Sequence, residues 1–307
     1  MSYEYFIVDA FTETPFGGVP VAVFPNAEFI PPAYRSVLCE ETGASDAVFV
    51  QSITSAKTAS EDRFGFEFFN AVGRTLPSAH TLIAGLAVLN ETKSLAQAHG
   101  TQSLKIETPE DCIEAFVDTS VTACPYLLKQ TLTPTLDNFV PIKQTIANII
   151  GLSDSDIADT NYNCLIASCG VPYLFVPLKS YHAVREAHFN NGPWAASSLP
   201  TSLVDKILLF APSTDQSGAH FHTRLLERNP VRGTDPAVGE TLPAFAAYLC
   251  QQKHVQKGTQ SITVRRGPND GRQSHLHLEI DNREEQPLGL RIGGSAIVAA
   301  KGVIFEH

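Results

Sequence analysis

Two polar turns, each leading into a short apolar run, are the parts of this chain best suited to chemistry. Ser78, His80 and Thr81 stand at the start of the first run. Residues 82–89, which follow, contain no polar side chain. The first amides of a helix have no partner inside it and carry partial positive charge. A helix that opens with these residues therefore offers an anion site with a titratable imidazole beside it.

The second run repeats this design in the other half of the chain. Asp235, Gly239 and Glu240 lie in the turn before it, and Thr241 leads into the apolar residues 242–250. The two helix starts are roughly 160 residues apart, and self-similarity over such a distance indicates a repeated structural unit. Here the titratable group that precedes the helix is Asp235.

A third titratable residue, Asp46, lies between a turn that contains Gly43 and a β-type run at residues 47–50. Asp46, His80 and Asp235 each have an ordinary explanation as turn or capping residues, and taken singly that explanation is favoured. An Asp–His–Asp set at a domain interface would suit proton transfer. The sequence alone does not bring the three side chains together.

Two buried helices are needed to position these residues. They are expected over residues 76–89 and 242–250, because a helix that is apolar on every face is buried on every face. Both are too short to span a membrane. Many short β-type runs surround each helix, which predicts mostly antiparallel α+β domains. The strand candidates are residues 5–11, 21–24, 47–50, 63–69, 103–107, 112–117, 163–168, 173–178, 206–211, 220–226, 261–266, 275–280 and 290–292.

The length of 307 residues favours two domains. We predict domains at residues 1–126 and 127–307 that share one plan, with the last strand allowed to cross back to the first domain. Residues 128–136 contain Thr and Pro and are the predicted linker. Residues 293–304 are predicted to close the chain as a hairpin-like pair of strands.

The composition is that of a globular protein with large cores, since 43% of residues are hydrophobic and 18% are charged. A net charge of −10 argues against binding to nucleic acid or to an anionic membrane. The net charge is still compatible with an anionic small substrate, because the positive end of a nearby helix can outweigh more distant negative charges. Six cysteines without close CxxC spacing indicate reduced thiols of a cytoplasmic protein. The N-terminal residues lack the basic and apolar regions of a signal peptide.

Two pairs of histidines have the alternate spacing that places both imidazoles on one face of a strand. They are His220 with His222, and His275 with His277. That spacing suits metal ligands. The sequence shows no third ligand, and paired surface histidines on strands are common, so no metal is predicted.

Several motifs, in order along nearly the whole chain, carry a family resemblance. Residues 45–50, Ser-Asp-Ala-Val-Phe-Val, resemble a Ser-Glu-Thr-x-Phe-Val motif. Residues 79–81, Ala-His-Thr, resemble Gly-His-Pro or Gly-His-Ala, and residues 235–240, Asp-Pro-Ala-Val-Gly-Glu, resemble Asp-Pro-x-Thr-Gly-Ser. Shorter likenesses lie at residues 8–11, 18–24, 271–274 and 293–296. With these motifs the chain resembles the PhzF-like proteins, which are isomerases of the diaminopimelate epimerase fold.

The resemblance implies two domains, each a curved sheet around a central helix, with the active site in the cleft between them. It implies that Asp46 is the acid/base, with His80 and Asp235 as its partners. The substrate-binding residues implied by the motifs are Ser45, Ala79, Thr81, Gly239, Glu240 and Thr241. It also implies a small carboxylate substrate, no cofactor and a homodimer. The two cysteine acid/bases of true diaminopimelate epimerases are absent from residues 79–80 and 239–240, which disfavours that activity.

The chain departs from the family pattern at residues of the expected site. Asp46 stands where the family has Glu, so its carboxylate is about 1.5 Å nearer the backbone, and a misplacement of about 1 Å can lower a rate ~100-fold. Val19 replaces an Asn, and Ala79 replaces a Gly. Glu240 places a carboxylate where a hydroxyl usually binds an anion. It would repel an anionic substrate unless it points away or is protonated.

Two functions from different classes follow. The first is a cofactor-free isomerase or epimerase that moves a proton on a small carboxylate, with Asp46 as acid/base. The second is a catalytically silent small-molecule-binding or interaction protein on the same scaffold, which the changes at Asp46, Val19 and Glu240 favour. Incorporation of solvent deuterium into a panel of small carboxylates would discriminate between them.

Overall fold

The computed structural model describes residues 2–52, 62–95, 100–121, 123–214, 218–228 and 235–306. The chain divides into two compact units, each a mixed α+β structure. Unit 1 consists of Met1–Gln130, Asp270–Leu276 and Arg291–His307, and unit 2 of Thr131–Asn269 and His277–Leu290. Within the described ranges, no helix combines the length and the apolar character needed to cross a membrane.

In unit 1, strands surround the helix that the apolar run predicted. Its strands are β1 (Ser2–Ala10), β2 (Val19–Phe24), β3 (Asp46–Ser52), β4 (Asp62–Phe69), β5 (Arg74–Thr75), β6 (Thr101–Glu107), β7 (Cys112–Asp118), β8 (Tyr126–Leu132, whose last two residues belong to unit 2) and β17 (Ala296–Phe305). Its helices are α1 (Arg35–Thr42) and α2 (Ala79–Glu91), with 3-10 turns η1 (Ala27–Phe29) and η2 (Pro32–Tyr34). Strand β1 is antiparallel to β2, β2 is parallel to β3, β3 is antiparallel to β4, and β4 is parallel to β6.

The sheet of unit 1 is covered on both faces, because its strands alternate two sets of apolar side chains. Helix α2 contacts β1, β2, β3, β4 and β17, and residues 79–89 of this helix are all buried. Phe66 packs so closely on α2 that a Cβ built on Gly85 would lie 2.3 Å from its Cε2 atom. The other set of side chains, including Ala22, Phe24 and Phe49, packs with Leu38 of α1 in a separate core.

In unit 2, another apolar helix is arranged in the same way. The strands are β9 (Thr135–Asp137), β10 (Leu165–Ser168), β11 (Pro172–Pro177), β12 (Lys206–Pro212), β13 (Phe221–Glu227) and β14 (Gly258–Arg266), and β15 (Ser274–Asn282) and β16 (Leu288–Gly294) are divided between the units. The helices are α3 (Lys143–Ile150), α4 (Tyr181–Glu186), α5 (Asn191–Ala195) and α6 (Leu242–Gln251), with 3-10 turns η3 (Asp154–Asp156) and η4 (Gly239–Thr241). Strands β10 to β14 pair antiparallel, parallel, antiparallel and parallel in turn, as β1, β2, β3, β4 and β6 do in unit 1.

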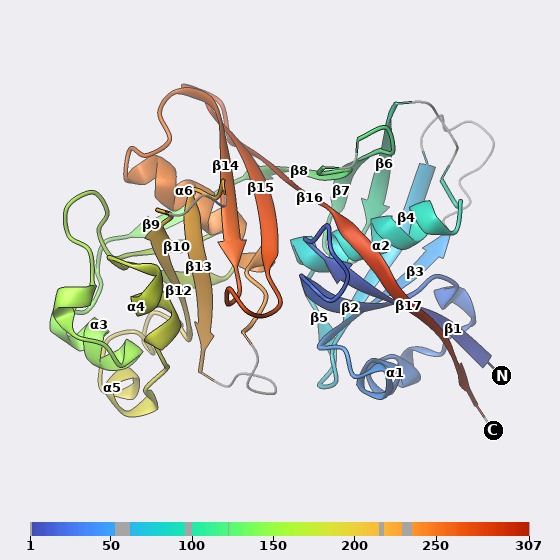
Figure 1. Cartoon of the computed structure of the whole chain (residues 1–307), viewed down its shortest axis with the longest axis horizontal. Coiled ribbons are helices and arrows are strands. Elements are labelled where there is room, and N and C mark those ends of the chain that lie inside the picture. The colour runs from blue at the N-terminus through green and yellow to red at the C-terminus, as the bar shows by residue number, and fades with distance from the viewer. Residues whose placement is uncertain are drawn as a thin grey trace. The chain divides into compact units, whose positions relative to one another are not determined.

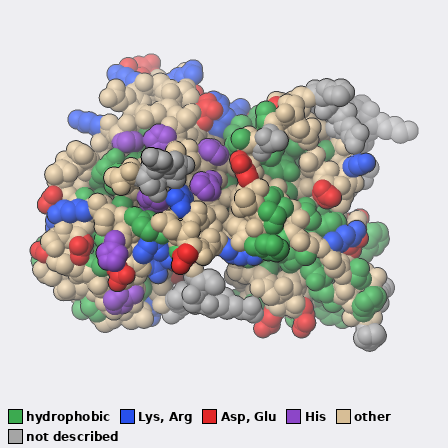
Figure 2. Space-filling model, in the orientation of Figure 1, with side chains coloured by type: hydrophobic (Ala, Val, Ile, Leu, Met, Phe, Trp, Pro, Cys, Tyr) green, Lys and Arg blue, Asp and Glu red, His purple; other side chains and the backbone are tan. Residues whose placement is uncertain are grey.

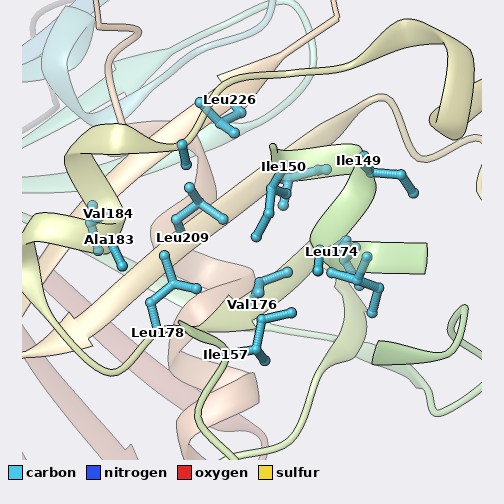
Figure 3. Packing of buried hydrophobic residues seen from close by; sticks show 14 of the residues in the cluster. Ile149, Ile150, Ile157, Leu174, Val176, Leu178, Ala183, Val184, Leu209 and Leu226 are labelled. Carbon is cyan, nitrogen blue, oxygen red and sulfur yellow. The ribbon is translucent and has the colours of Figure 1, made fainter. Parts of the chain in front are cut away.

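The sheet of unit 2 also has two buried faces. On one face, Phe175 and Phe210 pack against Phe245 of α6, with ring centroids 5.8 and 5.2 Å apart. On the other, an aliphatic core joins the strands to the outer helices, including Leu209 of β12, Ile150 of α3 and Val184 of α4 (Figure 3). Each unit is therefore a sheet with one apolar helix on one face and further helices on the other.

Two predictions about the chain's course, the linker and the closing hairpin, can be compared with the structure. The chain passes from unit 1 to unit 2 between Gln130 and Thr131, inside the predicted linker of residues 128–136. Most of this segment is nevertheless in strands, since it contains the end of β8, which pairs with β7, and the start of β9. The alternating burial of Tyr126, Leu128 and Leu132 explains this, since a strand buries every second side chain. The threonines that suggested a linker are also common in strands.

The closing residues do not form a hairpin. Strand β17 is one long strand that runs antiparallel to β1, with Ser2 opposite Phe305 and Ala10 opposite Ala296 (Figure 1). Gly293 and Gly294, at the start of the predicted hairpin, lie in β16, where space is short. A Cβ on Gly294 would lie 2.4 Å from the Phe11 ring, so close packing accounts for this glycine.

Candidate active site

Asp46 is the first residue of β3, and the end of α1 sets its position. Gly43 ends α1 with a left-handed φ of 73°, which favours glycine, and the chain then turns into the strand. Ser45 Oγ donates a hydrogen bond to Asp46 Oδ2 at 2.9 Å. The Asp46 side chain is 26% exposed, so the carboxylate is partly shielded but remains accessible.

His80 is the second residue of α2, and it is buried at the entrance of that helix. Its Nε2 lies 3.4 Å from Asp46 Oδ2, and its Nδ1 lies 2.9 Å from Ser78 Oγ. The structure thus brings together two of the three residues predicted to transfer protons. Ser78, the residue just before α2, also takes part in this contact. It was not among the predicted catalytic or substrate-binding residues.

When Asp46 is ionised, one assignment of donors and acceptors suits the Ser78 hydroxyl, both His80 ring nitrogens and the Asp46 carboxylate. The Ser78 hydroxyl donates to His80 Nδ1, and His80 Nε2–H donates to Asp46. When Asp46 holds a proton, it donates to His80 Nε2, and His80 Nδ1–H donates to Ser78 Oγ. The contact therefore accommodates both protonation states of Asp46, as an acid/base requires.

Thr81 and Ala79 serve the helix itself. Thr81 Oγ1 donates to the Ser78 carbonyl at 2.9 Å and accepts from the Ser78 amide at 3.1 Å. These bonds fix the first turn of α2, and they occupy the Thr81 hydroxyl. Ala79 is buried as the first helical residue.

Asp235 has a different environment, among the arginines of unit 2. Arg224 Nε donates to Asp235 Oδ1 at 2.9 Å, Arg185 pairs with Oδ2, and Arg266 binds the Asp235 backbone carbonyl. Burial would raise the pKa of this carboxyl, but the Arg185 hydrogen bond and the three guanidinium charges outweigh it and lower the pKa below its ordinary value. Asp235 is therefore an ionised carboxylate at neutral pH. A joint role with Asp46 and His80 stays a prediction.

Glu240 is the second residue of η4, which leads directly into α6. Its Oε1 accepts a hydrogen bond from Lys206 Nζ at 2.6 Å, and the same ammonium lies 3.3 Å from Glu227. The carboxylate that the sequence predicted to repel an anion is therefore paired. The Thr241 hydroxyl donates to the Val238 carbonyl at 2.8 Å, and Gly239 is buried, so both residues shape the turn.

The paired histidines have partners other than a metal. His220 Nδ1 accepts a hydrogen bond from the Thr263 amide at 3.0 Å, His277 Nδ1 lies 3.3 Å from Thr263 Oγ1, and the His222 ring packs on Tyr181. Figure 2 shows several histidine side chains gathered on one face of unit 2. Among the residues that the structure describes, no group of three or more His, Cys, Asp or Glu is placed to hold a metal ion.

Comparison with known proteins shows the family of this chain. The chain matches the family described as PhzC-PhzF, phenazine biosynthesis-like protein, over residues 8–302. The chain belongs to this family. An uncharacterized isomerase from Mesorhizobium japonicum is 22% identical over 316 residues, covering 98% of each chain. The trans-2,3-dihydro-3-hydroxyanthranilate isomerase from Pseudomonas fluorescens is 23% identical over 310 residues, covering 98% of this chain and 99% of the relative.

Solved structures establish the fold of this PhzF-family chain. A PhzF-family phenazine biosynthesis protein from Bacillus anthracis matches with a TM-score of 0.84 at 19% identity, over 100% of both chains. A hydroxyproline epimerase from Agrobacterium vitis matches with a TM-score of 0.61 at 14% identity, over 99% of this chain and 92% of the epimerase. The predicted PhzF membership and the predicted α+β, diaminopimelate epimerase-like fold are both confirmed.

Proposed function

We propose that this PhzF-family protein is a cofactor-independent isomerase that moves a proton on a small carboxylate-containing metabolite. The contact of Asp46 with His80 at the entrance of α2 is the observation that carries the proposal. It places a partly exposed carboxylate, a buried imidazole and positively polarised helix amides at one point. Relatives over almost the whole chain are named isomerases, which supports the same reaction class.

In the proposed reaction, Asp46 removes a proton from a carbon next to a carbonyl or conjugated system. His80 and Ser78 reverse their hydrogen bonds as Asp46 gains the proton. The amides at Ala79 and His80, at the start of α2, stabilise the negative charge that develops on the substrate. Asp46 then returns the proton to another carbon, or to the other face of the same carbon, so the substrate keeps its composition.

The remaining predicted residues have supporting roles in this proposal. Ser45 orients the Asp46 carboxylate through its hydroxyl. Asp235, being ionised, binds a positive or hydrogen-bond-donating part of the substrate more readily than it carries a proton. Ala79, Gly239 and Glu240 bind substrate, whereas the hydroxyls of Thr81 and Thr241 hold their own helix starts.

The test is proton exchange from deuterated water into a panel of small carboxylates, followed by NMR and mass spectrometry. The panel includes trans-2,3-dihydro-3-hydroxyanthranilate and trans-4-hydroxy-L-proline. Exchange by the wild type that Asp46→Asn abolishes supports the proposal. Glu41→Gln, a change at an exposed residue of α1, is the matched control.

One alternative has its own support. Asp46 is shorter than the glutamate of the resembling motif, and the Asp235 carboxylate is already paired with two arginines. Both features suit a protein that binds a small carboxylate without converting it. Binding of panel members without any deuterium exchange would establish this second function and overturn the first.

A further inference from the structure

The entrances of α2 and α6 occupy the same place in the pairing pattern of their units. Asp46 is the first residue of β3, and Lys206 is the first residue of β12. Each of these strands runs parallel to the strand before it and antiparallel to the strand after it. His80 is the second residue of α2, and Glu240 is the second residue of the turn that leads into α6.

At both entrances, the first residue of the strand contacts the second residue of the helical segment. His80 Nε2 lies 3.4 Å from Asp46 Oδ2, and Lys206 Nζ lies 2.6 Å from Glu240 Oε1. Strand alternation places Lys206 on the same face of β12 as Phe210, whose ring packs on Phe245 of α6. The second pair therefore stands at the entrance of α6 as the first pair stands at the entrance of α2.

The two pairs differ in charge. Lys206 lies between two carboxylates, Glu240 at 2.6 Å and Glu227 at 3.3 Å, so the three side chains carry a formal charge of −1. Burial would lower the pKa of Lys206, but the two carboxylates outweigh it and raise the pKa, which keeps the ammonium charged. The Tyr173 hydroxyl also lies against Glu240.

Glu240 is the member of this group best placed to meet a ligand. Its side chain is 32% exposed, compared with 27% for Lys206 and 21% for Glu227. A carboxylate has about four acceptor positions, so contacts with Lys206 and Tyr173 leave acceptor capacity for a ligand. Lys206 also forms an ion pair with Glu227, so Glu240 can accept a hydrogen bond from a ligand while the Lys206 ammonium keeps a carboxylate partner.

We propose that Glu240 determines specificity by binding the protonated amine of an amino-carboxylate ligand, and that Lys206 and Glu227 position it. This rests on the proposed function, because it names the substrate class of that reaction. A carboxylate only accepts hydrogen bonds, and an excess negative charge favours a cation over a second anion. A small carboxylate without an amine would meet repulsion at this entrance.

The experiment uses matched ligands that differ only in the amine. The pairs are L-proline with cyclopentanecarboxylate, and cis-2-aminocyclohexanecarboxylate with cyclohexanecarboxylate. Dissociation constants are measured by NMR titration of the full-length protein at pH 7. The wild type should bind each amino acid roughly ten- to hundredfold more tightly than its partner, as expected for one charge-assisted hydrogen bond.

Glu240→Gln should remove most of that preference, and Glu240→Ser, which restores the hydroxyl of the family motif, should favour the plain carboxylates. Glu41→Gln should keep the wild-type preference. Equal affinities within each pair, including no measurable binding of either member, overturn the assignment, as does a preference that survives Glu240→Gln.

Deuterium exchange in the same samples separates this outcome from failure of the proposed reaction. An Asp46-dependent exchange without amine preference refutes only the role of Glu240. An amine preference without exchange supports that role and refutes the isomerase.

Discussion

Asp46 and Asp235 are both short carboxylates near a helix start, but their surroundings give them opposite chemical characters. The contacts of Asp46 include the Ser45 hydroxyl and the His80 imidazole, neither of which carries a permanent charge. Asp235 has Arg185 and Arg224 on its two oxygens. A proton carrier must change its protonation state in each cycle, and guanidinium groups oppose that change. These surroundings therefore favour Asp46 as the base and Asp235 as a fixed charge.

Replacement of the proposed base tests this directly. Asp46→Asn should lower exchange activity roughly 10²–10⁴-fold, the usual contribution of general acid–base catalysis, without changing the fold. Asp46→Glu lengthens the side chain to that of the family motif and should raise turnover on substrates of PhzF-family type. Exchange rates are measured by NMR in deuterated water, with circular dichroism as the check on folding. Exchange that Asp46→Asn leaves unchanged would falsify the role.

The arginines around Asp235 predict a particular dependence of stability on pH. The pKa of Asp235 is lowered in the folded state, so its contribution is fully present above the unfolded value of 3.8 and is lost as the pH falls further. Asp235→Asn should lower the free energy of unfolding by about 2 kcal/mol at pH 7, because two half-buried arginines lose their charge-assisted hydrogen bonds to the carboxylate. Urea denaturation at pH 7 and pH 3 measures the difference. A deficit of equal size at both pH values would contradict the assignment.

At the scale of elements, a helix inside a sheet leaves no spare volume around its small residues. Gly85→Ala should destabilise the protein by roughly 1–3 kcal/mol, since the new Cβ would meet the Phe66 ring. Gly192→Ala is the matched helical control, because nothing lies within 4 Å of its Cβ position. Thermal unfolding gives both values. Phe66→Leu added to Gly85→Ala should restore part of the loss, and strict additivity of the two changes would refute the proposed clash.

The sequence predicted these elements well where one residue pattern decides the outcome. The apolar runs predicted α2 and α6, and the motif around Asp46 pointed to its contact with His80. Lys206 was not predicted because no local sequence pattern identifies it. Its importance comes from its position as the first residue of β12, which only the strand pairing defines. Arg185 is 50 residues from Asp235, and no periodicity reports such a contact.

At the scale of the whole molecule, unit 1 is built from three separate parts of the chain. Asp9 of β1 is fully buried, and its partner is Arg272, at 2.7 Å. The Phe16 amide donates to the other oxygen of the same carboxylate at 2.8 Å. The early residues 8–11 and the late residues 271–274, which the family motifs flagged separately, thus meet in one buried contact. Unit 1 therefore depends on residues that follow all of β1 to β14.

A fragment of residues 1–130 should not fold by itself. It lacks β17, which leaves one edge of β1 unpaired, and it lacks Arg272, which leaves Asp9 as an uncompensated buried charge. Two-dimensional NMR of the fragment should show collapsed amide dispersion, in contrast to the full chain. Cooperative unfolding of the fragment alone would contradict this dependence.

We also expect the protein to be a homodimer, from its resemblance to the PhzF family. Light scattering coupled to size exclusion at micromolar concentration should give a mass near twice 33.3 kDa. Elution at the mass of one chain over the whole concentration range would exclude this assembly.

The pairing of β17 with β1 also determines when unit 1 can finish folding during synthesis on the ribosome. Domains usually fold in the order in which they are made, with the N-terminal one first. Here the first strand must wait for residues 296–305, while unit 2 has all its parts once residue 290 has left the exit tunnel. The nascent chain therefore carries an incomplete N-terminal half, with one edge of β1 open, for almost the whole of translation. Chaperones that bind exposed strands would have their longest opportunity there.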